Sequence, residues 1–226
     1  MILILLGPPG AGKGTQARRL QEEFHLKQIA TGDLVREEIA SGSDLGKRIK
    51  AIIDRGEYPD DQIFIDMFRR EMSKPAKGFI CDGFPRTINQ AQVLDDFLTE
   101  IKKPLTAVIE MDVDQELLIK RLSGRFNCKE CKASYNDYFS PTLKEGVCDI
   151  CGSTEFFRRS DDNPEAVKRR FEVYREQTSQ LVDFYQAKGL LYRVNGNNAP
   201  DEVHAEIVRL IHKLTSSEVS IKLSSS

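Results

Sequence analysis

The chain has 226 residues, 40% of them hydrophobic and 30% charged, which predicts a soluble globular protein with one sizeable domain and insertions, or two small domains. Its formal net charge of −2 excludes the broad basic field of a dedicated nucleic-acid-binding protein. No apolar run is long enough to span a membrane, and residues 1–6 are too short and too soon followed by glycines to form a signal peptide. We therefore expect a cytoplasmic location, and neither a membrane nor a nucleic acid as a partner.

The first predicted element is an apolar strand over residues 2–6, which leads into the segment GPPGAGKGT at residues 7–15 and a helix over residues 16–25. Strand, tight turn and helix form the setting of a phosphate-binding loop, because glycines let backbone N–H groups surround an anion at a helix N-terminus. Lys13 adds a charge able to bridge two phosphates. Gly14 stands where the general motif has Ser or Thr, so the magnesium-binding hydroxyl is missing at that position, and Thr15 carries a hydroxyl one residue later.

Residues 30–59 are predicted to form a small helical flap. A short strand over residues 27–30 leads into Thr31-Gly32-Asp33, which predicts a turn that caps a helix. Apolar residues keep a helical period as far as residue 53, and the polar segment SGSD at residues 41–44 interrupts them. The pattern therefore indicates a pair of short helices.

From residue 60 onward, predicted strands alternate with helices. A helix over residues 61–72 precedes a wholly apolar strand at residues 78–81, with Asp82 at its carboxyl end. A helix (89–99), a strand (105–113) and another helix (115–122) follow. The alternation predicts an α/β fold with a largely parallel sheet and right-handed crossovers, in which ligands bind at the carboxyl ends of the strands.

This pattern stops between residues 123 and 160 and then resumes. A proline-started helix is predicted from residue 164 to about 188, followed by a strand (190–194) and a helix (200–214). The serine-rich end is expected to be frayed. We divide the chain into core segments 1–29, 60–123 and 162–214, a flap 30–59, an insert 124–161 and a tail 215–226.

Four of the five cysteines form two Cys-x-x-Cys pairs, Cys128 with Cys131 and Cys148 with Cys151, separated by sixteen residues. This spacing predicts one tetrahedral zinc site, which is structural because four thiolates leave no position for a catalytic water. The alternatives are unrelated thiols or an iron–sulfur or redox role. Cys81 is expected to be a small buried hydrophobic residue.

Arginines gather around the predicted loop edge and the insert. They are Arg36, Arg86, Arg121, Arg125, Arg158, Arg159 and Arg170. Each alone is compatible with a solvated surface charge. Beside a phosphate-binding loop they indicate a site for several phosphoryl groups, because a guanidinium group binds phosphate oxygens in bidentate fashion.

With these segments in place, the sequence resembles the adenylate kinase family through about residue 214. The resemblance is carried by residues 7–15, Thr31-Gly32-Asp33, DGFPRT at 82–87 with Gln90, RLSGR at 121–125 and RSDD at 159–162. It implies a P-loop NTPase-type parallel sheet flanked by helices, with an AMP-binding flap and a zinc-containing lid at the insert. It also implies a monomer that catalyses reversible, Mg²⁺-dependent phosphoryl transfer from ATP to AMP, giving two ADP.

The resemblance further implies a role for each residue that matches the family pattern. ATP is assigned to Gly10, Ala11, Gly12, Lys13, Gly14, Thr15, Arg121 and Arg125. AMP is assigned to Thr31, Arg36, Gly83, Arg86, Gln90, Arg159 and Arg170, with Thr31 and Gln90 facing its adenine. The groups around the transferred phosphoryl group are Lys13, Arg125, Arg159 and Arg170. Asp82 and Asp33 are expected to order magnesium-bound water, and Asp161 to hold a lid arginine.

Two alternatives remain open at this point. A UMP or CMP kinase is expected to carry Asn at the base-facing positions, where this chain has Thr87 and Gln90. A zinc-ribbon nucleic-acid-binding module on an NTPase scaffold requires a continuous basic, aromatic surface on the insert. Acidic residues interrupt that surface at Glu130, Asp137, Glu145, Asp149 and Glu155.

Overall fold

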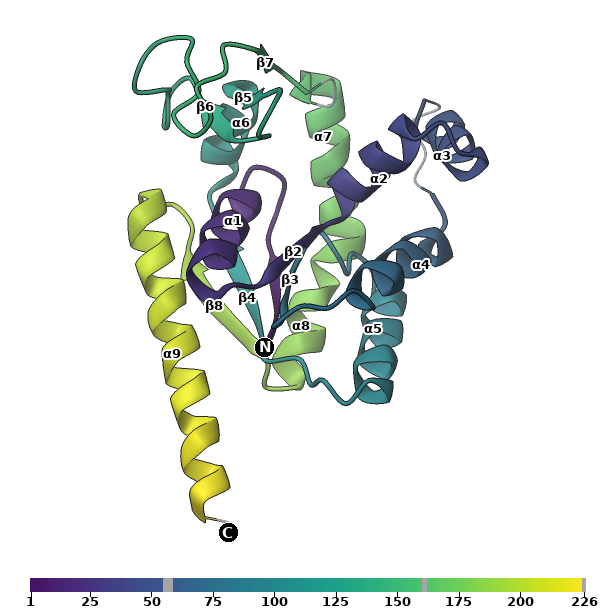
Figure 1. Cartoon of the computed structure of the whole chain (residues 1–226), viewed down its shortest axis with the longest axis vertical. Coiled ribbons are helices and arrows are strands. Elements are labelled where there is room, and N and C mark those ends of the chain that lie inside the picture. Colours follow the sequence, from purple (N-terminus) through teal and green to yellow (C-terminus); the bar gives the residue numbers. More distant parts are fainter. Residues whose placement is uncertain (55–58, 160–161, 225–226) are drawn as a thin grey trace.

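The computed structural model describes residues 1–54, 59–159 and 162–224, and its centre is a five-stranded parallel sheet (Figure 1). The strands are β1 (Ile2–Leu6), β2 (Lys27–Ala30), β3 (Phe79–Asp82), β4 (Ala107–Asp112) and β8 (Leu191–Asn195), in the order β2-β3-β1-β4-β8. The inner strands are almost wholly apolar, as expected for strands that are covered on both faces. The predicted α/β class with a parallel sheet is confirmed.

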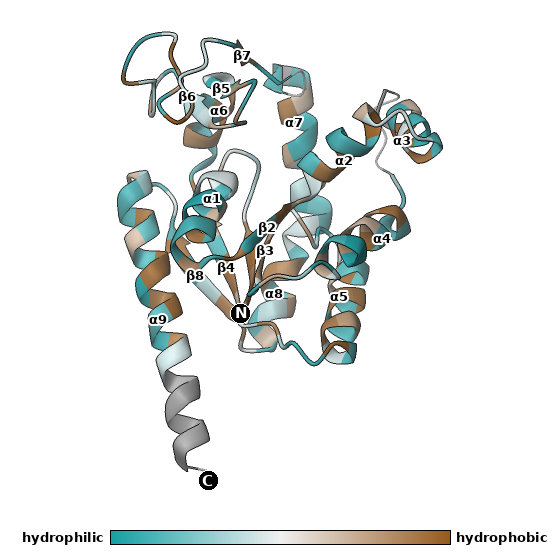
Figure 2. Ribbon diagram, viewed as in Figure 1, coloured by the Kyte–Doolittle hydropathy of each residue, from teal (hydrophilic) through white to brown (hydrophobic). Residues whose placement is uncertain are grey.

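Helices cover both faces of this sheet. One face packs against α4 (Asp61–Met72), α5 (Ile88–Glu100) and α8 (Gln180–Ala187). The other packs against α1 (Lys13–Phe24), α6 (Gln115–Ser123), α7 (Pro164–Val173) and α9 (Pro200–Ser224). Successive residues of β1 point to opposite faces, so Ile4 packs with the first set and Leu5 with the second. Figure 2 shows brown, apolar strands β3 and β4 within the sheet, between helices of mixed colour.

The strand register brings three segments to one edge of the sheet. Asp82, the last residue of β3, is paired with Leu5 of β1 and with Ala30 of β2. The carboxyl ends of these strands are therefore level. The glycine-rich loop after β1, the flap after β2 and the Asp82 carboxylate meet at this edge.

Two inserts project beyond the same end of the sheet (Figure 1). The flap consists of α2 (Thr31–Ala40) and α3 (Asp44–Asp54). The second insert forms a small antiparallel sheet of β5 (Arg125–Cys128), β6 (Ser134–Asn136) and β7 (Phe156–Phe157), in the order β6-β5-β7. Within the described part of the chain, no helix is both long and apolar enough to cross a bilayer.

Several helix boundaries differ from the sequence-based prediction. Helix α1 begins at Lys13 rather than at residue 16, directly after its N-cap Gly12. Thr31 and Asp33 lie in the first turn of α2 rather than in a separate capping turn, and an acidic residue in that turn is favoured by the helix dipole. The long predicted helix over residues 164–188 is divided by a π-helical segment, η2 (Tyr174–Thr178).

The C-terminal tail also differs from the prediction. Helix α9 continues to Ser224, whereas the sequence predicted a frayed segment from residue 215. Neither Gly nor Pro follows Leu214, and nothing in the sequence therefore stops the helix there. The Thr215 hydroxyl donates a hydrogen bond back to the carbonyl of Ile211, at 3.0 Å, within the continuing helix.

Candidate active site

The glycine-rich loop places backbone donors at the start of α1. Gly10 and Gly12 have φ of +86° and +95°, a region that side chains other than glycine rarely adopt. A Cβ on Gly10 would lie 3.0 Å from Cγ of Leu122, so the loop also packs closely on α6. No side chain caps α1. The N–H groups of its first turn are therefore presented to an anion, as in a phosphate-binding loop.

The Lys13 ammonium group lies at the centre of the charged site. Its Nζ donates hydrogen bonds to the carbonyls of Gly7 and Pro8, at 2.7 and 3.0 Å. Burial lowers the pKa of Lys13 to about 8, and the negative charge of Asp82 opposes this decrease. Three positive charges add to it: Arg86, Arg170 and Arg125. Cations from β3–α5, from α7 and from the second insert are therefore close enough to act on one lysine.

Asp82 lies against the loop at the position where the general motif has a hydroxyl. A Cβ on Gly14 would lie 3.4 Å from Oδ2 of Asp82, and Gln28 donates a hydrogen bond to the same oxygen at 3.1 Å. Burial raises the pKa of Asp82, Lys13 opposes the increase, and the charge of Asp33 adds to it. A partly compensated carboxylate with a second one nearby is a suitable donor set for a hydrated magnesium ion.

Residues after β2 and β3 form the flap side of the site. The Gly83 carbonyl accepts hydrogen bonds from Oγ1 of Thr31 at 2.9 Å and from Nε of Arg86 at 2.8 Å. Gly83 has φ of +80°, and a Cβ there would lie 2.8 Å from Oγ1 of Thr31. Only glycine therefore allows this approach. Arg36 forms an ion pair with Asp33 within α2.

The predicted base-facing residue Gln90 is buried at the start of α5. Its Oε1 accepts a hydrogen bond from the backbone N–H of Arg86 at 2.8 Å, and its Nε2 donates to Asp61. The structure therefore places the Gln90 amide against the backbone of Arg86. Asp61, to which the sequence assigned no role, holds the amide on its other side.

The arginines that flank the insert meet at Asp162. Its carboxylate accepts hydrogen bonds from Nε and Nη2 of Arg125 and from Nη1 of Arg170. The prediction named the neighbouring Asp161, which lies outside the described residues. The carbonyl of Arg159 accepts a hydrogen bond from the N–H of Asp162 at 3.2 Å, so the backbones of the two residues are in contact.

Two other arginines contact the insert itself. The guanidinium of Arg121 lies 5.9 Å from the ring centre of Phe139, and burial lowers the pKa of Arg121. The half-exposed ring of Phe139 is a contact that the sequence did not single out. Arg158 instead forms an ion pair with Asp137, at 2.8 Å, within the insert.

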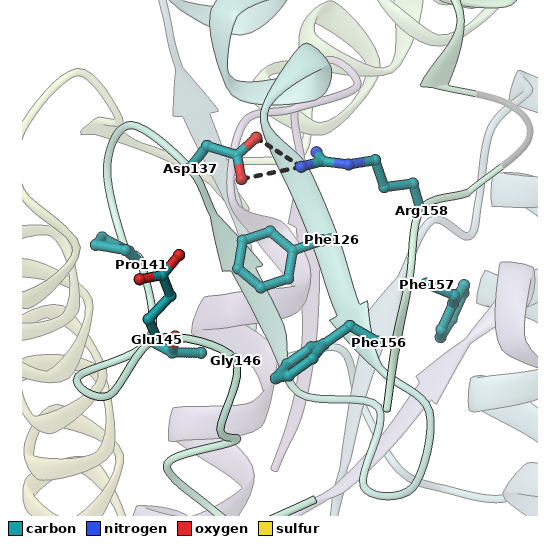
Figure 3. Close-up of a pocket in the computed structure, with 9 residues that line it drawn as sticks. Phe126, Asp137, Pro141, Glu145, Gly146, Phe156, Phe157 and Arg158 are labelled. Atoms are coloured by element: carbon teal, nitrogen blue, oxygen red, sulfur yellow. Dashed lines mark hydrogen bonds and ion pairs between the residues drawn. The ribbon is translucent and has the colours of Figure 1, made fainter. Parts of the chain in front are cut away.

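The Asp137–Arg158 pair lies at the rim of a cavity of about 510 Å³ in the insert (Figure 3). Its apolar wall is formed by Phe126, Phe156 and Phe157. None of the loop or flap residues assigned to a nucleotide lines this cavity. It is therefore separate from the site at the carboxyl edge of the sheet.

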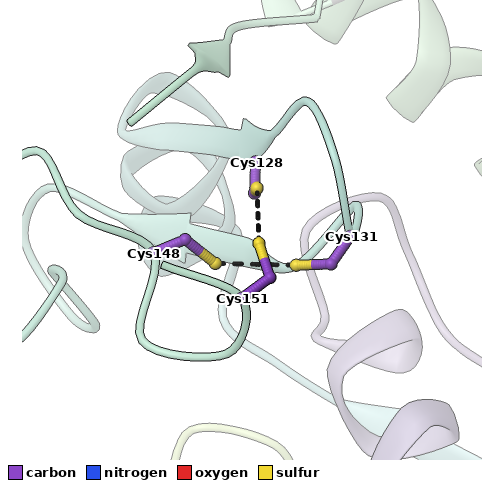
Figure 4. Close-up of side chains that lie close together, drawn as sticks. All are labelled: Cys128, Cys131, Cys148 and Cys151. Atoms are coloured by element: carbon purple, nitrogen blue, oxygen red, sulfur yellow. Dashed lines mark hydrogen bonds between the residues drawn. The ribbon is translucent and has the colours of Figure 1, made fainter. Parts of the chain in front are cut away.

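The four paired cysteines converge in the insert (Figure 4). Their sulfur atoms lie within 4.8 Å of one another; Cys128 and Cys151 are 3.6 Å apart, and Cys131 and Cys148 are 3.5 Å apart. Four ligands at about 2.3 Å from a tetrahedral zinc ion would be about 3.8 Å from each other. The hydroxyl of Tyr135 lies 3.2 Å from the sulfur of Cys148, where it can donate a hydrogen bond to a metal-bound thiolate. The sulfur atoms therefore fit a zinc ion.

Comparisons with known proteins agree with this arrangement. A family model described as adenylate kinase matches residues 5–190. An adenylate kinase of Paracoccus denitrificans is 48% identical over 212 residues, which cover 94% of this chain and 97% of that protein. Adenylate kinases of Thermodesulfovibrio yellowstonii and Archaeoglobus fulgidus are 47% and 43% identical, over 94% and 96% of this chain and the whole of each relative.

The fold, the loop and these relatives define a phosphotransferase of the nucleoside monophosphate kinase class. Within this class, the chain belongs to the adenylate kinase family. The relatives support this function over a pyrimidine-specific kinase and over a nucleic-acid-binding NTPase. The expectation from the sequence is therefore confirmed at the level of family and reaction class.

Proposed function

We propose that the chain reversibly transfers the terminal phosphoryl group of Mg²⁺-bound ATP to AMP, giving two ADP and balancing the adenine nucleotides. One observation carries this proposal. Lys13 lies beside Asp82 and within electrostatic reach of Arg86 from the flap side and of Arg125 and Arg170 from the insert side. Transfer between two polyanions needs positioning and charge neutralisation of this kind more than a general base.

On the donor side, the loop amides of residues 10–15 bind the ATP phosphates. Lys13 exchanges its bonds to the Gly7 and Pro8 carbonyls for phosphate oxygens. Bound Mg²⁺ supplies further neutralisation of phosphate charge. Asp82 and Asp33 would hold this hydrated ion, and Asp82 is suited to the role because it lies against Gly14, where no hydroxyl is available.

On the acceptor side, Arg36 and Arg86 bind the phosphate of AMP. The Arg36–Asp33 pair keeps that guanidinium on the flap until the phosphate arrives. Thr31 and Gln90 face the adenine, and the Gly83 carbonyl joins Thr31 to Arg86. The base and the phosphate of AMP therefore contact one hydrogen-bonded group of residues.

On the insert side, Arg125, Arg159 and Arg170 surround the group in transfer. Asp162 fixes the directions of Arg125 and Arg170 before substrates bind, which favours the transition state. Arg121 and the ring of Phe139 contact the adenine of ATP. A zinc ion held by the four cysteines stabilises the insert without taking part in the chemistry.

The flap (30–59) and the lid (124–161) close over the core to exclude water, because hydrolysis of ATP is the competing reaction. The cytoplasmic location and the monomeric state stay predictions, and sedimentation analysis would measure the latter. The decisive experiment assays AMP, UMP, CMP and GMP as acceptors with MgATP. We expect AMP to be strongly preferred, and a preference for UMP or CMP would overturn the proposal.

A further inference from the structure

Gln90 is a buried amide whose two ends contact chemically different partners. Its Nε2 donates to Oδ1 of Asp61, while its Oε1 accepts from the backbone N–H of Arg86. The residue is only 2% exposed. A carboxylate can only accept hydrogen bonds and a backbone N–H can only donate them, so these partners permit one of the two amide orientations. The hydrogen-bond polarity of Gln90 is therefore set by its neighbours.

The Asp61 carboxylate is itself held in place. Its Oδ2 accepts hydrogen bonds from Oγ1 of Thr87 at 2.9 Å and from Nδ2 of Asn89 at 3.3 Å. Thr87 is also the N-cap of α5, where its hydroxyl oxygen accepts from the N–H of Gln90 at 3.2 Å. Asp61 is the first residue of α4, and its carboxylate therefore ties the start of α4 to the start of α5.

We propose that Asp61 is a positioning residue that fixes the Gln90 amide in the orientation that pairs with adenine and rejects bases of reversed polarity. This inference rests on the proposed function, in which Gln90 faces the base of AMP. With one N–H bonded to Asp61 and one lone pair bonded to Arg86, Gln90 offers a ligand one N–H and one lone pair in a fixed order.

The order matters because purines differ in it. Adenine presents the acceptor N1 beside the donor 6-amino group, which suits an amide that offers one donor and one acceptor. Hypoxanthine and guanine present an N1–H donor beside the acceptor O6, which is the reverse order. An amide free to turn by 180° would pair with either kind of base. The Asp61 carboxylate and the Arg86 N–H together oppose this turn, and the carboxylate is the partner that a side-chain substitution can change.

AMP and IMP test this directly, because the two nucleotides have nearly the same shape. Their bases have opposite hydrogen-bond polarity at N1 and at the substituent on C6. For the wild type, we expect kcat/KM for AMP to exceed that for IMP by about 100-fold or more. In Asp61→Asn the new amide can donate or accept, so only the Arg86 N–H still opposes a turn of Gln90, and the AMP to IMP ratio should fall by about tenfold. Asp61→Glu, which keeps an acceptor-only carboxylate, should retain more of the ratio.

Asp60→Asn is the matched control. Asp60 is the N-cap of α4, where its carboxylate accepts from the N–H of Gln62, and an asparagine caps equally well. This variant should keep the wild-type ratio. If Asp61→Asn instead lowers activity toward AMP and IMP by the same factor, Asp61 is only structural and the proposal is overturned.

A second measurement needs neither a variant nor activity. The side-chain amide protons of Gln90, observed by NMR in the wild type, should exchange with water more slowly than those of exposed glutamines. Rapid exchange would overturn the proposal. Slow exchange in a protein that does not phosphorylate AMP would support the fixed amide and refute the proposed function instead, so the two failures are distinguishable.

Discussion

Arg125 and Asp162 form a bidentate ion pair that joins the insert to the core. Nε and Nη2 of Arg125 lie 2.8 and 2.5 Å from the two carboxylate oxygens. The side chains are only 17% and 6% exposed, so water and salt screen the pair weakly. Asp162 also accepts from Arg170, and one carboxylate thereby orients two guanidinium groups at the proposed reaction centre.

Asp162→Asn should therefore lower kcat by about 10- to 100-fold, because both arginines lose their orientation. The KM values should change less than kcat. The free energy of unfolding should fall by about 3 kcal/mol, since a buried charge is left without its partner. Steady-state kinetics and urea denaturation measure the two effects. Asp137→Asn breaks the exposed ion pair with Arg158. It should lower the free energy of unfolding by less than about 1 kcal/mol and leave kcat unchanged. Equal effects of the two substitutions would contradict the assignment.

Lys13→Met should reduce turnover by about three orders of magnitude in a coupled assay of ADP formation, because the charge between the phosphates is lost. The variant should remain folded, as judged by circular dichroism. A variant with wild-type turnover would refute the role of Lys13.

Lys13 should also make stability depend on pH in a defined window. Its pKa is about 8 in the folded protein and 10.5 as the ordinary value. Between these values the unfolded chain binds more protons at this position, so the contribution of Lys13 to stability rises as pH increases from about 8 to about 10.5. Urea denaturation at pH 7.5 and 9.5 should show a smaller pH-dependent gain in Lys13→Met than in the wild type. Identical slopes in the two proteins would contradict the lowered pKa.

Zinc should be present at about one equivalent per chain by elemental analysis, and its removal by a chelator should lower the melting temperature. The reason is that the described core of the insert is small, consisting of Cys128, Ala133, Tyr135 and Cys148. Tyr135→Phe should weaken zinc binding by about tenfold, because a hydroxyl donor to the Cys148 sulfur is lost. Tyr138→Phe, at an exposed ring of the same insert, is the control. Metal-free protein with unchanged melting would exclude a structural zinc site.

Gly10→Ala should destabilise the protein more than Gly42→Ala. Both glycines have positive φ, at +86° and +68°, and this strain alone costs about 1 kcal/mol. A Cβ on Gly42 meets no atom within 4 Å, whereas a Cβ on Gly10 lies 3.0 Å from Leu122. Only Gly10→Ala should also raise the KM for ATP, because the loop must move. Equal stabilities and unchanged KM would show that the loop tolerates a side chain there.

The sequence predicted local features well and contacts between distant side chains poorly. The five strands of the main sheet and the cysteine cluster follow from apolar runs and fixed spacing, which are local patterns. Asp162, which binds Arg125 and Arg170, was not singled out because adjacent carboxylates look alike in sequence, and the predicted Asp161 lies outside the described residues. Asp61 was missed because its partner Gln90 lies 29 residues away in the first turn of another helix.

The pairing of Asp82 with Leu5 and Ala30 has an evolutionary consequence. Side chains alternate along a strand, so inserting or deleting one residue within β3 would turn Asp82 away from the loop. The turns and the two inserts are not constrained by this alternation of side chains, so they can change length without moving the Asp82 carboxylate. Diversification of such a chain should therefore concentrate in its inserts, while the lengths of the central strands stay constant.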